Sequence, residues 1–308
     1  MPVRPFRFGA QGRGAESAAA WRAKARRAED LGYDTLLVPD HFPFGLGPVA
    51  ALMAAADATT TLRVGTFVLD NDFRHPVVLA KEVATLDLLS GGRFELGIGA
   101  GWFRAEYEAA GLPFAPAPER IARLDESLRV LKALFGEGPV TFRGAHYTLT
   151  AMNQAPKPVQ RPHPPILVGG GARRILSLAA READIVGLGP RARPDGTTDA
   201  LSISRAATEQ KLAWVREAAG PRLDALELNI YVYEVAETND RAAVAAAFAE
   251  NELPVETVLE SPHTLIGSLD SMVEDLERRR EEYGLSYIVV PEDKMEPLAP
   301  IIARLKGR

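Results

Sequence analysis

The stretch LRVGTFVLDNDFRHPVVLAKEVATLDLLSGGRFELGIGAGW, from Leu62 to Trp102, changes from a strand-like to a helix-like pattern and back. Residues 62–69 form an apolar, strand-like run. Pro76 then suits the first turn of a helix, where no amide hydrogen is needed, and apolar residues follow at helical spacing. The pair Gly91-Gly92 is a typical helix end, and 93–101 has a second strand-like pattern. The stretch therefore predicts a strand–helix–strand unit with parallel strands.

The same alternation continues along the chain, which has 308 residues. Eight strand-like segments separated by helical patterns predict eight parallel βα units, and a chain of this length with eight units is typical of an α/β (β/α)8 TIM barrel. A doubly wound open sheet is the alternative. The eight segments are Phe6–Gln11, Leu36–Pro39, Leu62–Leu69, Arg93–Gly101, Pro164–Gly171, Ala183–Gly189, Leu226–Val235 and Leu285–Pro291.

Two segments interrupt this pattern within what we expect to be one TIM-barrel domain, 1–308. The segment at about 139–165 reads as a short hairpin around Gly144 followed by a proline-rich connector. We interpret it as an insertion, because the alternation resumes directly after it. The second segment, at about 195–207, is polar. We expect the two segments to form a lid over the substrate pocket.

Composition narrows the class of protein. Hydrophobic residues make up 46% and charged residues 25%, and the net charge is −5, which is ordinary for a globular protein and argues against a nucleic-acid or membrane partner. The absence of cysteine excludes disulfides and thiolate chemistry. No signal-peptide pattern and no apolar run of roughly 20 residues is found. We therefore expect a cytoplasmic protein.

Several catalytic motifs are missing from the sequence. The five histidines are scattered and no HExxH occurs, so we expect no metal site. The sequence also contains no P-loop and no GxSxG motif. These absences indicate that the chemistry belongs to a bound cofactor.

The second strand-like segment ends in Asp40 and His41. In a TIM barrel the carboxyl ends of the strands form the active site. His41 is therefore a candidate for presenting a hydrogen-bond donor or a proton to a bound ring. The alternative is that Asp40 caps the following turn and His41 makes local hydrogen bonds. Gln11 lies at another strand end and is a candidate for the substrate pocket.

Two strand ends are rich in glycine. Gly169, Gly170 and Gly171 precede a helix that begins near Ala172, so their amides and the helix N-terminus suit a phosphate, with Arg173 as an additional donor. The alternative is a tight turn only. The other end, GIGAGW from 97 to 102, lacks the third glycine of a dinucleotide fingerprint at the required spacing. We interpret it as a strand end where a flat ring approaches the backbone, with Trp102 lining the pocket or packing locally.

The motifs AEDLGYDTLLVPDHF, RVGTFVL, FRHPVVLAKEVATLDLLSGGRFELGIGAGW, PPILVGGG and LIGSLDSMVEDLE give the chain a family resemblance nearly from end to end. The chain resembles the luciferase-like monooxygenase superfamily of flavin- or deazaflavin-dependent TIM barrels. The pair Asp40-His41 is similar to the subgroup that uses the deazaflavin coenzyme F420, whereas flavin monooxygenases of the superfamily often have Glu-His-His there.

The resemblance also implies roles for individual residues. It implies that Asp40 and His41 lie beside the deazaflavin ring and that Phe67 and Val68 form a cis peptide beneath it. It further implies that Ala100 and Gly101 line other approaches to the ring. Gly169, Gly170 and Gly171 would take the phosphate. The anionic tail of the cofactor would lie near an arginine such as Arg173.

One position departs from the family pattern. Deazaflavin-dependent sugar-phosphate dehydrogenases of this superfamily have a glutamate directly after the GxGxG motif, where this chain has Trp102. The resemblance therefore implies an F420-dependent oxidoreductase that transfers hydride to or from an apolar or aromatic substrate. The alternatives are an FMN-dependent monooxygenase, which uses O2 and a partner reductase, and a non-catalytic binding barrel. Relatives are commonly homodimers, so we expect a homodimer, with a flavin or F420 reductase as the source of reduced cofactor.

Overall fold

Eight parallel strands close into a barrel in the computed structural model, which describes residues 3–193, 195–250 and 252–308. The hydrogen-bonded order is β3-β2-β1-β15-β12-β9-β8-β5, and the pairing of β3 with β5 closes the ring. The predicted TIM barrel is confirmed, and the open sheet is wrong. The barrel strands are β1 Arg7–Gln11, β2 Thr35–Val38, β3 Arg63–Thr66, β5 Phe94–Gly99, β8 Ile166–Gly170, β9 Ile185–Leu188, β12 Glu227–Tyr231 and β15 Leu285–Pro291.

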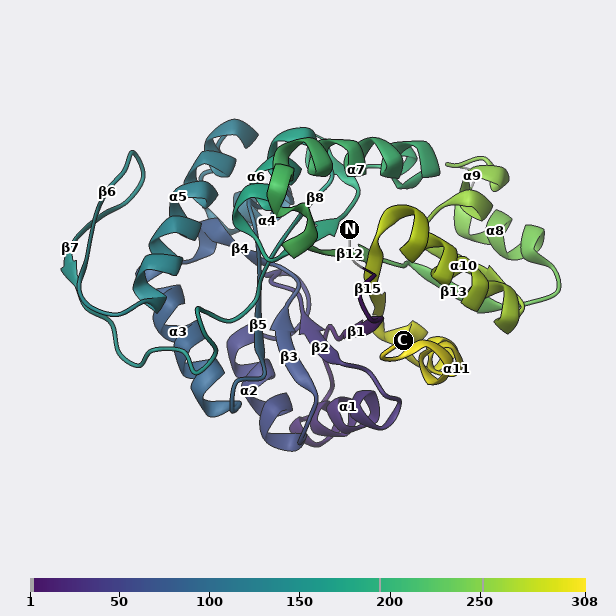
Figure 1. Ribbon diagram of the computed structural model, residues 1–308, viewed down its shortest axis with the longest axis horizontal. Helices are drawn as coiled ribbons and strands as arrows, with labels where there is room; N and C mark the ends of the chain where they lie inside the picture. Colours follow the sequence, from purple (N-terminus) through teal and green to yellow (C-terminus); the bar gives the residue numbers. More distant parts are fainter. Residues whose placement is uncertain (1–2, 194, 251) are drawn as a thin grey trace.

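Helices surround the barrel on its outside (Figure 1). They bury apolar residues against the strands; Leu79, Val83 and Leu86 of the helix after β3, for example, are at most 4% exposed. Among the described residues, no helix combines the length and the apolar character that crossing a bilayer requires. The α-helices are α1 Ala18–Asp30, α2 Pro48–Ala58, α3 Pro76–Leu89, α4 Arg104–Ala110, α5 Ala117–Phe135, α6 Arg173–Glu182, α7 Arg205–Ala219, α8 Arg241–Ala249, α9 Val255–Glu260, α10 Leu269–Tyr283 and α11 Met295–Leu305.

Two of the predicted strands are divided in the structure. The chain leaves β3 after Thr66 and pairs again only at β4, Leu69–Asp70, so Phe67 and Val68 lie outside the ladder. The predicted strand at 226–235 ends at Tyr231, and the chain then forms β13, Glu234–Glu237. Strand β13 pairs with β14, Thr264–Gly267, in a separate two-stranded sheet. From hydrophobicity alone, β4 and β13 could not be distinguished from continuations of the barrel strands.

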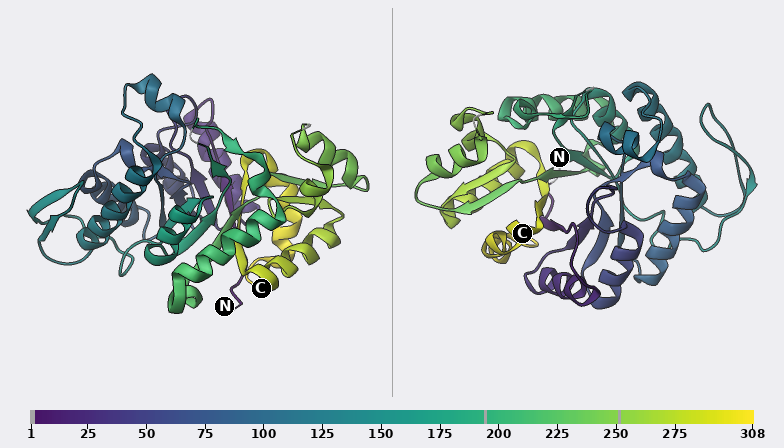
Figure 2. Two further views of the ribbon diagram at one scale, coloured as in Figure 1. Left: turned by 90° about the horizontal axis from the view of Figure 1, so that it is seen from above. Right: turned by 180° about the vertical axis from the view of Figure 1, so that it is seen from behind.

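The insertion forms the predicted hairpin, with strands β6 Val140–Arg143 and β7 Thr148–Met152 on either side of Gly144. Its loop is bound to α5 through Glu126, whose carboxylate accepts amide hydrogen bonds from Ala145, His146 and Tyr147. Figures 1 and 2 show the hairpin extending outward beside α3 and α5, away from the barrel axis. The insertion therefore lies outside the ring of barrel strands, on the side of α3 and α5.

The segment after β9 is attached to α7 by Lys211. The buried ammonium donates to the carbonyls of Gly189 and Ser202, both at 2.6 Å. Burial lowers the pKa of Lys211 to about 8. Between these anchors the chain forms strands β10 Arg191–Ala192 and β11 Thr198–Asp199. The predicted lid at 195–207 thus begins within this anchored segment and ends in α7.

Candidate active site

His41 and Glu106 form a hydrogen-bonded pair at the carboxyl end of β2. Glu106 is buried in α4, and its carboxylate oxygens lie 3.0 and 3.1 Å from His41 Nδ1. The same carboxylate accepts the amide hydrogen of Phe42 at 3.1 Å. Because an ionised carboxylate only accepts hydrogen bonds, Nδ1 carries the proton that it donates to Glu106. The neutral ring then presents a free lone pair at Nε2, the arrangement of a base oriented by an acid.

Aromatic side chains surround the imidazole of His41. The ring centroid of Phe44 lies 4.6 Å away, and the rings of Trp102 and Phe103 lie 6.0 and 6.2 Å away in edge-on orientation. Trp102 is 39% exposed and Phe44 is 43% exposed. Large apolar side chains left open to solvent in one place are typical of a binding site. Trp102 therefore lines the surface next to His41.

Asp40 is directed into the protein. Its carboxylate accepts two hydrogen bonds from the Arg74 guanidinium, at 2.5 and 3.0 Å, and one from the Asp70 amide at 3.1 Å. Asp40 is only 7% exposed. Its two oxygens are thus used in holding the β2 and β4 ends together. This geometry suits a residue that positions His41 better than one that contacts a bound ring.

A buried carboxyl group, Asp70, connects the β4 end to the loop after β5. The hydroxyl of Tyr107 donates to its Oδ2 at 2.6 Å. Burial raises the pKa of Asp70 to about 7. Gly101 has a φ of +73°, and a Cβ there would lie 2.1 Å from the Tyr107 hydroxyl, so only glycine fits. Arg120 donates to the carbonyls of Ala100 and Gly101, at 3.0 and 3.2 Å, and fixes the loop before Trp102.

Gln11 belongs to a hydrogen-bonded chain at the barrel mouth. Its Nε2 donates to the Phe67 carbonyl at 3.2 Å, and its Oε1 accepts from the Tyr231 hydroxyl at 2.8 Å. The Tyr231 ring stacks on Phe67 at 5.8 Å. The Tyr231 carbonyl in turn accepts a hydrogen bond from His263, whose pKa is lowered by burial to about 3. Gln11 therefore supports the Phe67 backbone from within the barrel.

The peptide between Phe67 and Val68 is cis, as the resemblance implied. The two glycines of GIG give this segment its room: a Cβ on Gly97 would lie 2.0 Å from the Thr66 oxygen, and a Cβ on Gly99 would lie 2.9 Å from Val68. The missing side chains at Gly97 and Gly99 therefore let the segment from Thr66 to Val68 pack closely against β5. At Gly97 and Gly99 the close neighbour is thus the chain at Thr66–Val68.

The three glycines after β8 differ in their surroundings. A Cβ on Gly171 would lie 2.2 Å from the Pro190 oxygen, and a Cβ on Gly170 would lie 2.4 Å from Ile175, so both are needed for close packing. A Cβ on Gly169 would meet nothing closer than 3.8 Å. A methyl group at Gly169 would thus sit in ordinary van der Waals contact with its neighbours.

The N-terminus of α6 has features that suit an anion. Its N-cap, Ala172, makes no side-chain hydrogen bond to the helix, and the first turn contains no acidic residue. Arg173 and Arg174 are the first two helical residues, which is unfavourable at the positive end of a helix unless an anion lies there. Arg173 itself is 60% exposed at its side chain and pairs with Glu217 at 2.8 Å. Its guanidinium would have to leave this partner to reach a bound phosphate.

The structure brings the predicted residues together in two groups. One contains His41 and Trp102, with Asp40 behind them; the other contains Gln11, Phe67 and Val68 at the barrel mouth. Sequence reasoning missed Glu106, which lies 65 residues from its partner. It also missed Tyr231 and Arg74. No local spacing connects these residues to the site, because each reaches it from another βα unit.

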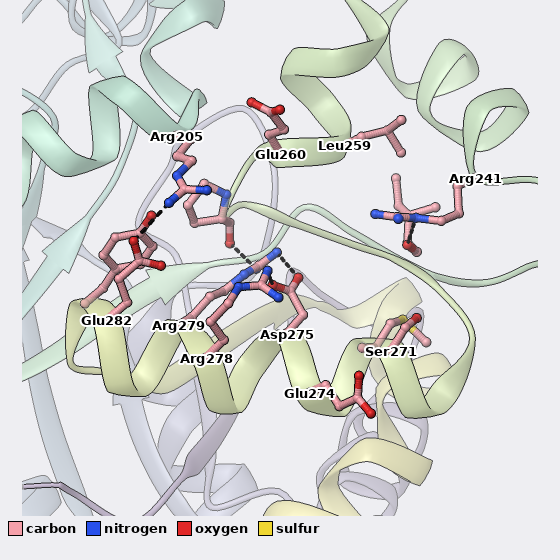
Figure 3. Close-up of a pocket in the computed structure, with 14 residues that line it drawn as sticks. Arg205, Arg241, Leu259, Glu260, Ser271, Glu274, Asp275, Arg278, Arg279 and Glu282 are labelled. Atoms are coloured by element: carbon pink, nitrogen blue, oxygen red, sulfur yellow. Dashed lines mark hydrogen bonds and ion pairs between the residues drawn. The ribbon is translucent and has the colours of Figure 1, made fainter.

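A polar pocket of about 260 Å³ lies elsewhere, along α10. Figure 3 shows that several of its charged side chains pair with one another: Arg279 and Arg278 bind Asp275, and Arg205 binds Glu282. Its lining contains four arginines and four acidic residues, so it carries no net charge. Within the described residues, no cluster of three or more His, Asp or Glu suits a metal ion.

Comparison with known sequences places these residues in a family context. A family model described as luciferase-like monooxygenase matches residues 3–284. An FMNH(2)-dependent dimethylsulfone monooxygenase of Pseudomonas putida is 34% identical over 169 residues, which cover 53% of this chain and 46% of that protein. An F420-dependent glucose-6-phosphate dehydrogenase of Amycolatopsis mediterranei is 35% identical over 168 residues, 52% and 50% of the two chains. The match thus spans about half the length of these curated relatives.

Solved structures share the fold over nearly the whole chain. The coenzyme F420 dependent tetrahydromethanopterin reductase from Methanopyrus kandleri superposes with a TM-score of 0.78 at 20% identity, covering 98% of this chain and all of that chain (100%). A long-chain alkane monooxygenase superposes with a TM-score of 0.76 at 14% identity, covering 98% and 92%. At these identities the likeness shows a common barrel. It does not choose between a deazaflavin and a flavin.

Proposed function

The chain belongs to the luciferase-like monooxygenase family, and from this premise we propose that it is an F420-dependent oxidoreductase. In this proposal it transfers a hydride between the deazaflavin and an uncharged, apolar or aromatic organic substrate. The observation that carries the proposal is the His41–Glu106 pair, which lies at a strand end among exposed aromatic rings. Such a pair can exchange a proton with a substrate while the surrounding rings limit the access of water.

The barrel mouth fits a flat, anionic cofactor. Gly169 is partly exposed and has no side chain, so its backbone beside Val68 can be approached by one edge of a ring system lying over the Phe67–Val68 peptide. The uncapped N-terminus of α6, with Arg174 in its first turn, suits the phosphate of the same molecule. A deazaflavin bound there supplies the carbon that accepts or donates the hydride.

The residues of the chain handle the proton. When a substrate hydroxyl is oxidised, its carbon loses a hydride and its oxygen loses a proton, which His41 Nε2 takes up. Glu106 stabilises the imidazolium that forms, through the Nδ1 hydrogen bond at 3.0 Å. In the reverse direction the same nitrogen returns the proton to a carbonyl oxygen. Asp40 acts indirectly, since its bonds to Arg74 and Asp70 hold the end of β2 in place.

An FMN-dependent monooxygenase is the second candidate. It is supported by the 34% identity to the dimethylsulfone monooxygenase, whose printed name specifies FMNH(2). In that function a partner reductase delivers the reduced flavin and O2 is consumed. The aromatic rings around His41 would then protect a reactive intermediate from water.

Turnover assays separate the two functions. The purified protein is incubated without oxygen with F420 and a panel of secondary alcohols, and the change in deazaflavin absorbance is followed. The parallel assay contains FMNH2, O2 and dimethylsulfone. Deazaflavin reduction that is lost in His41→Gln supports the first function. Product formed only with FMNH2 and O2 supports the second, and no turnover in either assay, with no cofactor bound, favours the non-catalytic barrel.

We also propose that the protein forms a homodimer. Val78 and Leu89 are 54% and 62% exposed, and their separation of 11 residues places them on one face of α3. Sedimentation analysis of the wild type and of Leu89→Asp tests this assembly. A monomeric wild type would contradict it.

A further inference from the structure

An apolar hollow of about 350 Å³ lies beside the His41–Glu106 pair. One wall is the chain after β2, with Phe42 and Pro43; the other is α4 with the residue before it, Phe103. Apart from Glu106, every lining residue is apolar; the set is Phe42, Pro43, Phe103, Ala105, Glu106, Ala109 and Ala110. Phe42 is 57% exposed, and its ring stacks on Phe73 with the centroids 4.3 Å apart.

The hollow and the candidate active site share walls. Phe103 lines the hollow and also lies 6.2 Å from the His41 ring. Glu106 lines it as well, while its two oxygens are bonded to His41 Nδ1 and to the Phe42 amide. The carboxylate is therefore already hydrogen-bonded. The described lining residues include no cationic side chain. A charged or strongly polar ligand group would lose its hydration there without finding a partner.

From the wall residues that the two sites share, we infer that the hollow holds an uncharged apolar limb of a substrate whose reacting end lies beside the His41–Glu106 pair. The inference rests on the proposed function, because it assigns a second part of the same substrate. An engineered apolar cavity of about 150 Å³ holds one benzene molecule. The hollow is more than twice that size, so it suits a limb of about two rings or an alkyl chain of comparable volume.

Two alanines of α4 determine how deep the limb extends. Ala105 and Ala109 are four residues apart, so they lie on one face of the helix, and both line the hollow. A larger side chain at either position would occupy the volume that the limb needs. Because both are exposed helical positions, leucine is tolerated there by the fold.

The test uses N-phenyl-1-naphthylamine, a neutral fluorophore that brightens in apolar surroundings. It is titrated into the cofactor-free wild type, into Ala105→Leu and Ala109→Leu, and into Ala247→Leu, which changes an exposed alanine of another helix, α8. We expect saturable binding to one site in the wild type and in the α8 control. In the two α4 variants we expect the affinity to fall at least 10-fold. F420 titrations of the same proteins report separately on the proposed function.

Several outcomes would overturn the inference. Unsaturable dye binding to the wild type, or equal affinity in Ala109→Leu, would exclude the hollow as a ligand site. Dye binding that weakens as protein concentration and dimer content rise would mean that a second copy covers the hollow. Once substrates are known, Ala109→Leu must raise KM for a long-limbed substrate at least 10-fold relative to a short one. A protein that binds the dye as expected but no cofactor would contradict the proposed function alone.

Discussion

Adding one methyl group at either of two glycines of the barrel should affect stability very differently. In Gly97→Ala the new Cβ would lie 2.0 Å from the Thr66 oxygen and 2.9 Å from the Thr66 carbonyl carbon. Both are backbone atoms, so the strand has to move. We expect the free energy of unfolding to fall by about 1–3 kcal/mol or more, as for other overpacked cores. In Gly169→Ala the nearest atom is the Gly187 oxygen at 3.8 Å, an ordinary contact. Stability should then stay within about 1 kcal/mol of the wild type.

Thermal unfolding and cofactor titration together measure this contrast. At roughly 2–4 °C per kcal/mol for a large domain, Gly97→Ala should lower the Tm by several degrees, and Gly169→Ala should change it by less than about 4 °C. The methyl group at position 169 would lie where we place the cofactor. The Kd of the cofactor should therefore rise at least 10-fold, which corresponds to about 1.4 kcal/mol. An unchanged Tm in Gly97→Ala would refute the packing argument. An unchanged Kd in Gly169→Ala would refute the position of the cofactor.

Three further predictions follow from individual side chains. Glu106→Gln should lower kcat about 100-fold and alter its pH profile while leaving the cofactor Kd unchanged; wild-type kinetics would remove Glu106 from the mechanism. Because the folded pKa of Asp70 is raised to about 7, the folded state binds more protons between about pH 4 and pH 7, and stability should fall as pH rises through that range. The change in stability over that range is roughly 4 kcal/mol at most, and Asp70→Asn should abolish it. Urea unfolding at pH 5 and pH 8 measures the pH dependence, and a dependence that persists in Asp70→Asn would contradict this assignment. Lys211→Met removes both hydrogen bonds that anchor the segment after β9, so trypsin should cut at Arg191 at least 5-fold faster, and an unchanged rate would show that the anchor is dispensable.

The barrel was predictable because its strands are short apolar runs bounded by turn residues. The unit at 62–101 shows this best: α3 begins at Pro76 and ends just before Gly91, which has a φ of +67°. The exceptions were local. Strand β14 at Thr264–Gly267 was not predicted, since its partner β13 lies in what read as the end of a barrel strand.

The site was predictable only where chain position decides it. His41 could be found because it directly follows a strand, and Trp102 because it follows the glycine-rich end of β5. Glu106 could not, because its contact with His41 depends on how α4 packs across the barrel mouth. The glycines at 97 and 99 were recognised as special, but the neighbour that requires them, the chain at Thr66–Val68, is known only from the folded structure.

The most direct test of the proposed function is a fluorescence titration of the purified protein with F420 and, separately, with FMN. We expect saturable F420 binding that is weakened in Gly169→Ala and retained in Glu106→Gln, with FMN binding at least 10-fold weaker. Preferential binding of FMN would contradict the deazaflavin assignment and support the monooxygenase. Binding of neither cofactor would contradict both.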